Sequence, residues 1–167
     1  KHKVVDDKPY GGGHGLILRV DVLEEAIAQT KDKNLSTNEQ KVVLLSPHGK
    51  TFNQKKALEF INLKHLILIC GHYEGVDERV KKFIDEELSI GDFIVTGGEI
   101  PAMLVTDAIT RLIKGVLKEG VTPSESFSEI LEYPQYTKPN TYKNSSVHPI
   151  LLSGNHKEIK SWRDKIS

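Results

Sequence analysis

The sequence predicts an α/β fold in which a parallel sheet is flanked by helices. Three short apolar runs, at 42–45, 65–70 and 92–96, are each followed by a loop rich in glycine or proline and then by a segment with helical spacing. Uninterrupted apolar strands that alternate with helices are typical of a parallel sheet whose two faces are both buried. With 167 residues, of which 38% are apolar and 28% charged, the chain can bury the core of one ordinary domain with an appended tail.

The N-terminal part begins with an irregular segment and continues into a helix. Residues 1–15 are polar and rich in glycine, which predicts a mobile loop rather than a regular element. Residues 20–30 place apolar side chains at helical spacing, with Asp21 as the expected N-cap. A charged connector at 31–40 then leads to the first apolar run.

Each apolar run leads into an expected helix. Thr51 or Asn53 can cap the first of these helices, which is expected to reach Leu63. The other two are expected at about 76–84 and 101–117, and the second of them starts with a proline, a residue favoured in the first turn of a helix. The same order of strand, loop and helix therefore recurs along the chain, which strengthens the prediction of a parallel sheet.

The character of the sequence changes after Gly120. Residues 121–147 combine several prolines with Ser, Thr, Asn and Glu, which is typical of a linker or of an extended arm that orders on a partner. Residues 155–166 are amphipathic and predict a terminal helix. We therefore expect an α/β domain at 1–120, a linker at 121–147 and the start of a helical domain at 148–167.

Composition and missing motifs exclude several classes of protein. Lys plus Arg equals Asp plus Glu, at 23 each, so no overall charge recruits nucleic acid, and RNA binding would need a local basic patch. The single cysteine, Cys70, excludes an internal disulfide and a CxxC metal site and suits a reducing cytosol. No apolar run approaches the roughly 20 residues of a membrane span, and the chain has no visible signal peptide and no HExxH, GxGxxG or GxxxxGK[ST] motif. These observations predict a cytoplasmic protein without a membrane segment or a protein metal site.

The loops after the apolar runs form the expected ligand site. Parallel strands end at one common edge of the sheet, so the loops that begin at Ser46, Gly71 and Gly97 should meet there. Tyr73 and Glu74 supply an aromatic face and a carboxylate, which suit a cationic or heteroaromatic ligand. Taken alone, each loop is equally consistent with an ordinary turn, and Arg111 beside an apolar helix face is consistent with a snorkelling side chain.

Several blocks of the chain together resemble the bacterial tRNA (guanine-N1)-methyltransferases. The blocks occur in the order of that family and spread over nearly the whole chain, whereas a single block would be a weak indication. They are VDDKPYGGG at 5–13, LSP at 45–47, CGHYEGVDER at 70–79, SIGD at 89–92, TGGEIPAM at 96–103 and LSGNH at 152–156.

The resemblance implies an α/β fold of the SPOUT type with a deep trefoil knot, which the residues alone do not suggest because knots are rare. It also implies a homodimer in which each S-adenosylmethionine pocket is completed by the other subunit. This cofactor carries no phosphate, in agreement with the missing phosphate-binding loops. The family's cofactor residues match Leu45, Pro47, Gly71, Tyr73, Glu74, Ser89, Ile90, Gly91, Val95, Gly97 and Gly98.

The implied reaction transfers a methyl group to N1 of the guanosine immediately 3′ of the tRNA anticodon, at position 37. N1 is protonated in neutral guanine, so the enzyme has to remove that proton and stabilise charge on O6. Arg111 matches the family's arginine and is the candidate for the O6 contact. Glu125 stands where the family has an aspartate base before a Ser-Phe pair, and its extra methylene changes the reach of the carboxylate. The chain also departs from the family at His14, where proline is usual, and in a linker one residue shorter around 129–131.

Beside the family, the chain is expected to lack an N-terminal strand and helix before Lys1 and most of a C-terminal helical tRNA-binding domain after Trp162. The α/β domain is then the cofactor-binding methyltransferase domain, and the expected partners are tRNA and a second copy of the chain. Mg²⁺ is expected to act, if it assists, without a protein metal site. Two alternatives stay open: a non-catalytic RNA-binding module of the same fold, and a related RNA methyltransferase with another target position.

Overall fold

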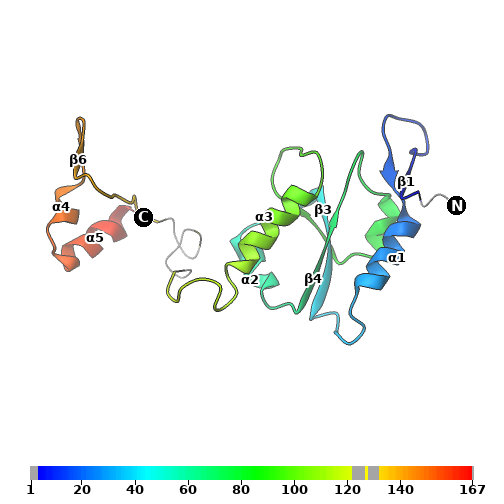
Figure 1. The fold of residues 1–167 in the computed structure, drawn as a ribbon, viewed down its shortest axis with the longest axis horizontal. Coiled ribbons are helices and arrows are strands. Elements are labelled where there is room, and N and C mark those ends of the chain that lie inside the picture. Colours follow the sequence, from blue (N-terminus) through cyan, green and yellow to red (C-terminus); the bar gives the residue numbers. More distant parts are fainter. Residues whose placement is uncertain (1–3, 122–126, 128–131, 167) are drawn as a thin grey trace. The chain divides into compact units, whose positions relative to one another are not determined.

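The structure is a computed structural model that describes residues 4–121, 127 and 132–166. The chain divides into two compact units, Lys1–Leu117 and Lys118–Ser167. The first unit contains the parallel sheet with its helices, and the second contains a short hairpin followed by helices (Figure 1).

A three-stranded parallel sheet forms the centre of the first unit. Strand β3 (Gln40–Thr51) lies between β4 (His65–Cys70) and β5 (Glu86–Ser89). Both pairings are parallel, and helices lie on both faces of the sheet (Figure 1). The predicted α/β fold with a flanked parallel sheet is therefore confirmed.

Helices cover the two faces unequally. Helix α1 (Val20–Thr30) lies on one face, while α2 (Gln54–Phe60) and α3 (Glu99–Thr110) lie on the other. A short 3₁₀ helix, η1 (Glu78–Lys82), contacts α1 and lies on the same face of the sheet. The chain thus alternates between strands and covering segments, as the sequence pattern predicts.

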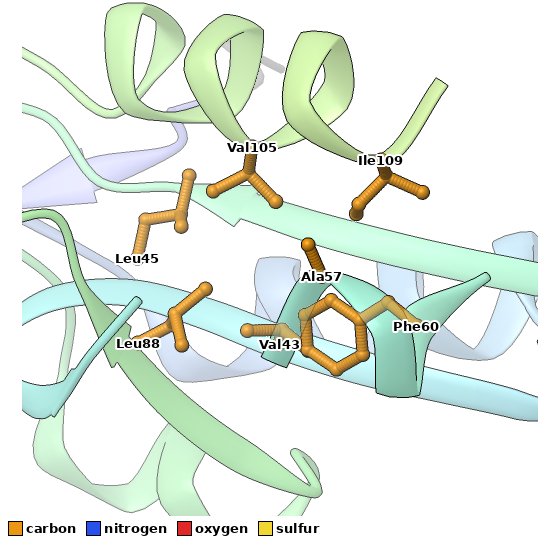
Figure 2. Packing of buried hydrophobic residues seen from close by; sticks show 7 residues of the cluster. All are labelled: Val43, Leu45, Ala57, Phe60, Leu88, Val105 and Ile109. Carbon is orange, nitrogen blue, oxygen red and sulfur yellow. The ribbon is translucent and has the colours of Figure 1, made fainter. Parts of the chain in front are cut away.

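Alternation along β3 divides its side chains between two apolar cores. Val43 and Leu45 pack with α2 and α3, whereas Val42 and Leu44 pack with α1 and η1. Figure 2 shows the first of these cores, in which Phe60 of α2 and Val105 of α3 approach the sheet. Because successive side chains of a strand point to opposite faces, an uninterrupted apolar run such as VVLL requires cover on both sides.

The third strand is displaced from its predicted position. The sequence predicted it at 92–96, but the structure places it at Glu86–Ser89 and leaves 92–96 without regular structure. The strand begins with the charged residues Glu86 and Glu87, so a search for apolar runs does not detect it. Glu86 is stabilised by Lys41 and Lys56, whose Nζ atoms lie 3.3 and 3.0 Å from its carboxylate oxygens.

Three expected helices are shorter in the structure, and the first of them, expected to reach Leu63, ends at Phe60. The segment predicted as a helix at 76–84 forms only η1, and the helix predicted at 101–117 starts two residues earlier and ends at Thr110. After Thr110 the backbone turns, and Gly115 adopts a positive φ of 89°. This conformation interrupts a helix although the apolar spacing continues.

The capping predictions met with different outcomes. Asn53 caps α2, since its Oδ1 accepts a hydrogen bond from the backbone N–H of Lys56 at 3.0 Å. The prediction of Asp21 as the cap of α1 is wrong, because Arg19 occupies the N-cap position and makes no side-chain cap bond. The Arg19 guanidinium instead lies 2.5 Å from Asp21, in an exposed ion pair.

The N-terminal segment contains more structure than a loop. Strand β1 (Asp6–Asp7) pairs antiparallel with β2 (Ile17–Leu18), and the glycine-rich stretch lies between them. The base of this hairpin joins the loop after β4, because the N–H of Glu74 donates to the carbonyl of Leu16 at 3.0 Å. The expected irregular segment is thus fastened to the edge of the sheet where a ligand site was predicted.

In the second unit, β6 (Thr141–Tyr142) and β7 (Ser145–Ser146) form a small antiparallel hairpin inside the expected linker. Helix α4 (Pro149–Leu152) follows, and α5 (His156–Ile166) confirms the predicted terminal helix. In the part of the chain that the structure describes, no helix is long and apolar enough to cross a membrane.

We predict that Phe60→Ala lowers the free energy of unfolding by about 3–5 kcal/mol, because it removes a ring that is 2% exposed and leaves a cavity. Leu58→Ala is the matched control on the same helix, since that side chain is exposed, and its effect should stay within about 0.5 kcal/mol. Urea unfolding of the two variants measures both values. Equal losses would contradict the assigned core.

Candidate functional site

A pocket of about 320 Å³ lies at the carboxyl edge of the sheet. Its walls come from the middle of β3, the loop after β4 and the segment between β5 and α3. The lining residues are Leu45, Ser46, Pro47, Gly71, His72, Tyr73, Glu74, Gly75, Leu88, Ser89, Ile90, Gly91, Phe93, Ile94, Val95, Thr96, Gly97, Gly98 and Pro101. The three junctions singled out in the sequence therefore meet in one place.

The wall from β3 is an excursion within that strand. Leu88 of β5 pairs with Leu45 and again with Lys50, so the residues between them bulge out of the ladder. Gly49 makes this geometry feasible, because a Cβ at that position would lie 2.3 Å from the backbone nitrogen of Leu88. The bulge presents Ser46 and Pro47 to the pocket.

The wall after β4 is a tight turn. The N–H of Gly75 donates to the carbonyl of His72 at 2.9 Å, and Tyr73 adopts a positive φ of 56° within the turn. A bulky residue in this region is strained, and such strain is concentrated at functional sites. The Tyr73 side chain is exposed, and its ring lines the pocket on the side of the loop that follows β4.

The third wall runs from β5 to α3. Ser89 Oγ accepts a hydrogen bond from the N–H of Gly91 at 3.1 Å and lies 3.2 Å from the carbonyl of the same residue, which fixes the start of this segment. Its end is fixed by Gly98, whose N–H donates to the carbonyl of Gly71 at 2.9 Å. A Cβ on Gly98 would lie 2.5 Å from the Cα of Cys70, so the two main chains touch.

Charge at the pocket is sparse and includes no lysine or arginine among the lining residues. Glu74 is one carboxylate on the wall, and His72 forms a hydrogen bond with Glu99 at the start of α3. The hydrogen bond from His72 holds the pKa of the Glu99 carboxyl below its usual range. Burial raises the pKa of the Cys70 thiol, so that group stays a neutral, small side chain beneath the pocket.

The structure brings together all of the residues that the sequence matched to cofactor contacts. They lie in this pocket and number eleven: Leu45, Pro47, Gly71, Tyr73, Glu74, Ser89, Ile90, Gly91, Val95, Gly97 and Gly98. Their role as cofactor contacts stays a prediction. Arg111 lies at the C-cap of α3, is half-buried and is not among the lining residues, and Glu125 falls outside the described residues.

Several lining residues were missed by the sequence reasoning. All lie close to predicted residues along the chain, and all except Phe93 and Pro101 are direct neighbours of one, so their signal would have been proximity within the same loops: Ser46, His72, Gly75, Leu88, Phe93, Ile94, Thr96 and Pro101. Leu88 was missed for another reason, since its strand was predicted in the wrong place. Among the residues that the structure describes, no group of three or more His, Cys, Asp or Glu side chains could hold a metal ion.

Comparison with known proteins gives a consistent result over the whole chain. The family profile for tRNA (guanine-1)-methyltransferase TrmD matches residues 1–167. A tRNA (guanine-N(1)-)-methyltransferase of Metamycoplasma arthritidis is 53% identical over 169 residues, covering 100% of this chain and 71% of the relative. Proteins of the same name from Latilactobacillus sakei and Mycoplasma mobile are 52% and 49% identical, over 100% and 99% of this chain and 68% and 81% of their own lengths.

We predict that Gly98→Ala destabilises the fold by about 1–3 kcal/mol, because the new Cβ meets backbone atoms that cannot move aside. The φ of Gly98 is −76°, which alanine adopts freely, so the loss is steric. Gly71→Ala is the matched control, since the nearest atom to its Cβ would be 3.7 Å away. Thermal unfolding of both variants checks the prediction, and a wild-type melting temperature for Gly98→Ala would argue against the crossing of these two main chains.

Proposed function

Because this chain belongs to the tRNA (guanine-1)-methyltransferase family, we propose that it methylates N1 of guanosine 37 of tRNA, immediately 3′ of the anticodon, with S-adenosylmethionine as donor. The observation that carries the proposal is the single pocket in which all eleven matched cofactor residues converge. The loops hold the donor, and residues outside them act on the acceptor base. The reaction is a methyl transfer from a sulfonium to a ring nitrogen.

The pocket fits S-adenosylmethionine in size and chemistry. Its volume lies in the range of small-molecule sites, which begins at about 300 Å³. Leu45, Leu88 and Ile90 supply apolar surface for an adenine ring, and the glycines leave main-chain amides accessible to its polar edge. The absence of lysine and arginine from the lining and the presence of Glu74 suit a cationic ligand without phosphate. When bound, the cofactor supplies an electrophilic methyl group.

The acceptor needs a base and a stabiliser of charge on O6. Arg111 lies at the end of α3, whose first turn borders the pocket through Pro101, and its guanidinium would contact O6 as negative charge develops. Glu125 would accept the N1 proton of guanine. A nucleotide paired or stacked in the anticodon loop exposes N1 poorly, so the base has to leave its stack to reach these groups.

We further propose the homodimer and the deep trefoil knot of the SPOUT class. The exposed face of α3 supports the dimer. Ile100, Met103 and Leu104 are 66%, 71% and 46% exposed, and their spacing along the helix puts them on one face together with Asp107. The opposite face of this helix is buried in the core, and a helix that is apolar on both sides normally has cover on both. The path of the chain after β5 supports the knot. β5 lies on one side of β3 and β4 on the other, yet the segment that follows β5 reaches Gly71 at the end of β4.

The proposed function also bears on the cellular compartment of the protein and on the binding of Mg²⁺. We propose the reducing cytoplasm as the setting, which a tRNA substrate and the free Cys70 support. Mg²⁺, where it assists, would be bound with the RNA and not by a site built from the protein. Addition of EDTA to the binding assay below checks the second point, because affinity for the cofactor should not change.

We predict that Arg111→Ala lowers methyl transfer to a tRNA transcript about 10²–10³-fold, as expected for loss of one group that stabilises developing charge. Glu125→Gln should lower transfer about 10²–10⁴-fold. Both variants should retain the affinity for S-adenosylmethionine measured by calorimetry. Arg79→Ala is the control, since this exposed arginine pairs with Asp77 and does not line the pocket.

The same assay separates the competing functions. A transcript with adenosine at position 37 should receive no methyl group, and transfer to that transcript would indicate another target position. Cofactor binding without transfer to any tRNA would indicate a non-catalytic module. Transfer that is undiminished in Arg111→Ala would contradict the role of this arginine.

We predict that Met103→Glu dissociates the homodimer, because it puts a charge in the centre of the apolar face of α3. Ala28→Glu is the control, since it adds the same charge at an exposed position of α1. Light scattering after size-exclusion chromatography gives the mass of each variant. A wild-type chain that is monomeric at tens of micromolar, on the order of typical assay concentrations, would contradict the dimer.

A further inference from the structure

A hydrogen-bonded pair of side chains at the wall of the pocket has no part in the proposed chemistry. His72 lies in the loop after β4, and its Nε2 contacts Oε1 of Glu99, the first residue of α3. His72 belongs to the wall that follows β4, and Glu99 directly follows the Gly97-Gly98 turn of the wall between β5 and α3. The pair therefore joins two of the three walls of the pocket.

The pair lies directly against the Gly97-Gly98 turn. A Cβ on Gly97 would lie 2.6 Å from Oε2 of Glu99 and 2.9 Å from Cε1 of His72, so both side chains pack on this glycine. The main chains of the same segments are joined by the Gly98 to Gly71 hydrogen bond of 2.9 Å. The side-chain pair thus adds a second connection beside this backbone hydrogen bond.

The pair contributes little to the stability of the whole fold. The His72 and Glu99 side chains are 44% and 57% exposed, and surface ion pairs of this kind are generally weak because water and salt screen them. The Glu99 carboxylate is nevertheless well suited to remain ionised. It accepts a hydrogen bond from His72 and lies in the first turn of a helix, where negative charge is favoured, and its pKa is lowered accordingly.

We propose that His72 and Glu99 are positioning residues of the cofactor pocket, which hold the Gly97-Gly98 turn in the shape that binds the ligand. This inference rests on the proposed function, since the ligand is taken to be S-adenosylmethionine. Two adjacent glycines have many accessible conformations, and fixing them before binding removes an entropic cost from the binding step. The pair acts through the turn and does not have to touch the ligand.

Calorimetry with S-adenosylmethionine tests the effect on binding. His72→Ala and Glu99→Gln should each weaken binding about 10-fold, and the double variant should be no weaker than either single one, since both remove the same contact. His72→Glu should weaken binding further because it places two carboxylates side by side. Combining His72→Glu with Glu99→Lys rejoins the two positions through an ion pair and should recover most of the affinity. A merely structural loss would not be recovered in this way.

The matched control is the pair of Lys64 and Glu39. It is an ion pair of 2.5 Å, with Lys64 exposed and Glu39 half-buried, that joins the segments before β4 and β3, which are also bridged by a backbone hydrogen bond of 2.8 Å. It lies at the opposite edge of the sheet. Lys64→Ala and Glu39→Gln should leave the affinity unchanged, and all variants should melt close to the wild-type temperature.

Hydrogen exchange without ligand makes the inference independent of the proposed function. Exchange at the Gly98 amide should be faster in His72→Ala and Glu99→Gln than in the wild type, because the turn opens more often. Unchanged exchange would overturn the inference whatever the affinities are. Faster exchange in a chain that does not bind S-adenosylmethionine would instead overturn the proposed function alone. Wild-type affinity in both single variants would also overturn the inference.

Discussion

Close contact between main chains at the carboxyl edge of the sheet is the constraint on which the rest of the structure depends. Gly49 lies against the backbone of Leu88, and Gly98 lies against Cys70 and Gly71. Neither contact leaves space for a Cβ atom. These contacts bring three chain segments close enough to enclose a pocket, and glycines that line it, such as Gly71, Gly97 and Gly98, carry no side chain between a ligand and their backbone. A ligand with a planar base and a compact cationic centre suits such a surface.

The buried core holds this edge in place. β3 passes through the centre of the sheet, and its alternating side chains tie α1 and η1 to one face and α2 and α3 to the other. Val105 anchors α3 on the sheet, and the first turn of that helix borders the pocket. Burial of α3 therefore fixes both one wall of the pocket and the position of Arg111 at the C-cap of the helix. The stability of the core and the shape of the pocket depend on the same helix.

Much of the fold followed from local patterns, and the failures have a common cause. The helix at 20–30 was predictable from its apolar spacing, and the strand at 65–70 from its uninterrupted apolar run. The strand at 86–89 was missed because Glu86 is compensated by Lys41 and Lys56, which are distant in sequence. The apolar residues at 92–96 misled for the converse reason: Ile94 is 82% exposed in this unit, so its apolar character marks no strand.

The sequence by itself determined the alternation of strands and helices, the glycine-marked junctions and the motifs that identify the family, since each of these depends on residues that are neighbours along the chain. Only the tertiary structure decided that the junctions enclose one pocket, that β3 bulges between Leu45 and Lys50, and that the His72 side chain contacts Glu99. These features depend on strand order and on backbone approach between segments far apart in sequence. Local propensity contains no information about such distances, because they are set by how the two faces of the sheet are packed.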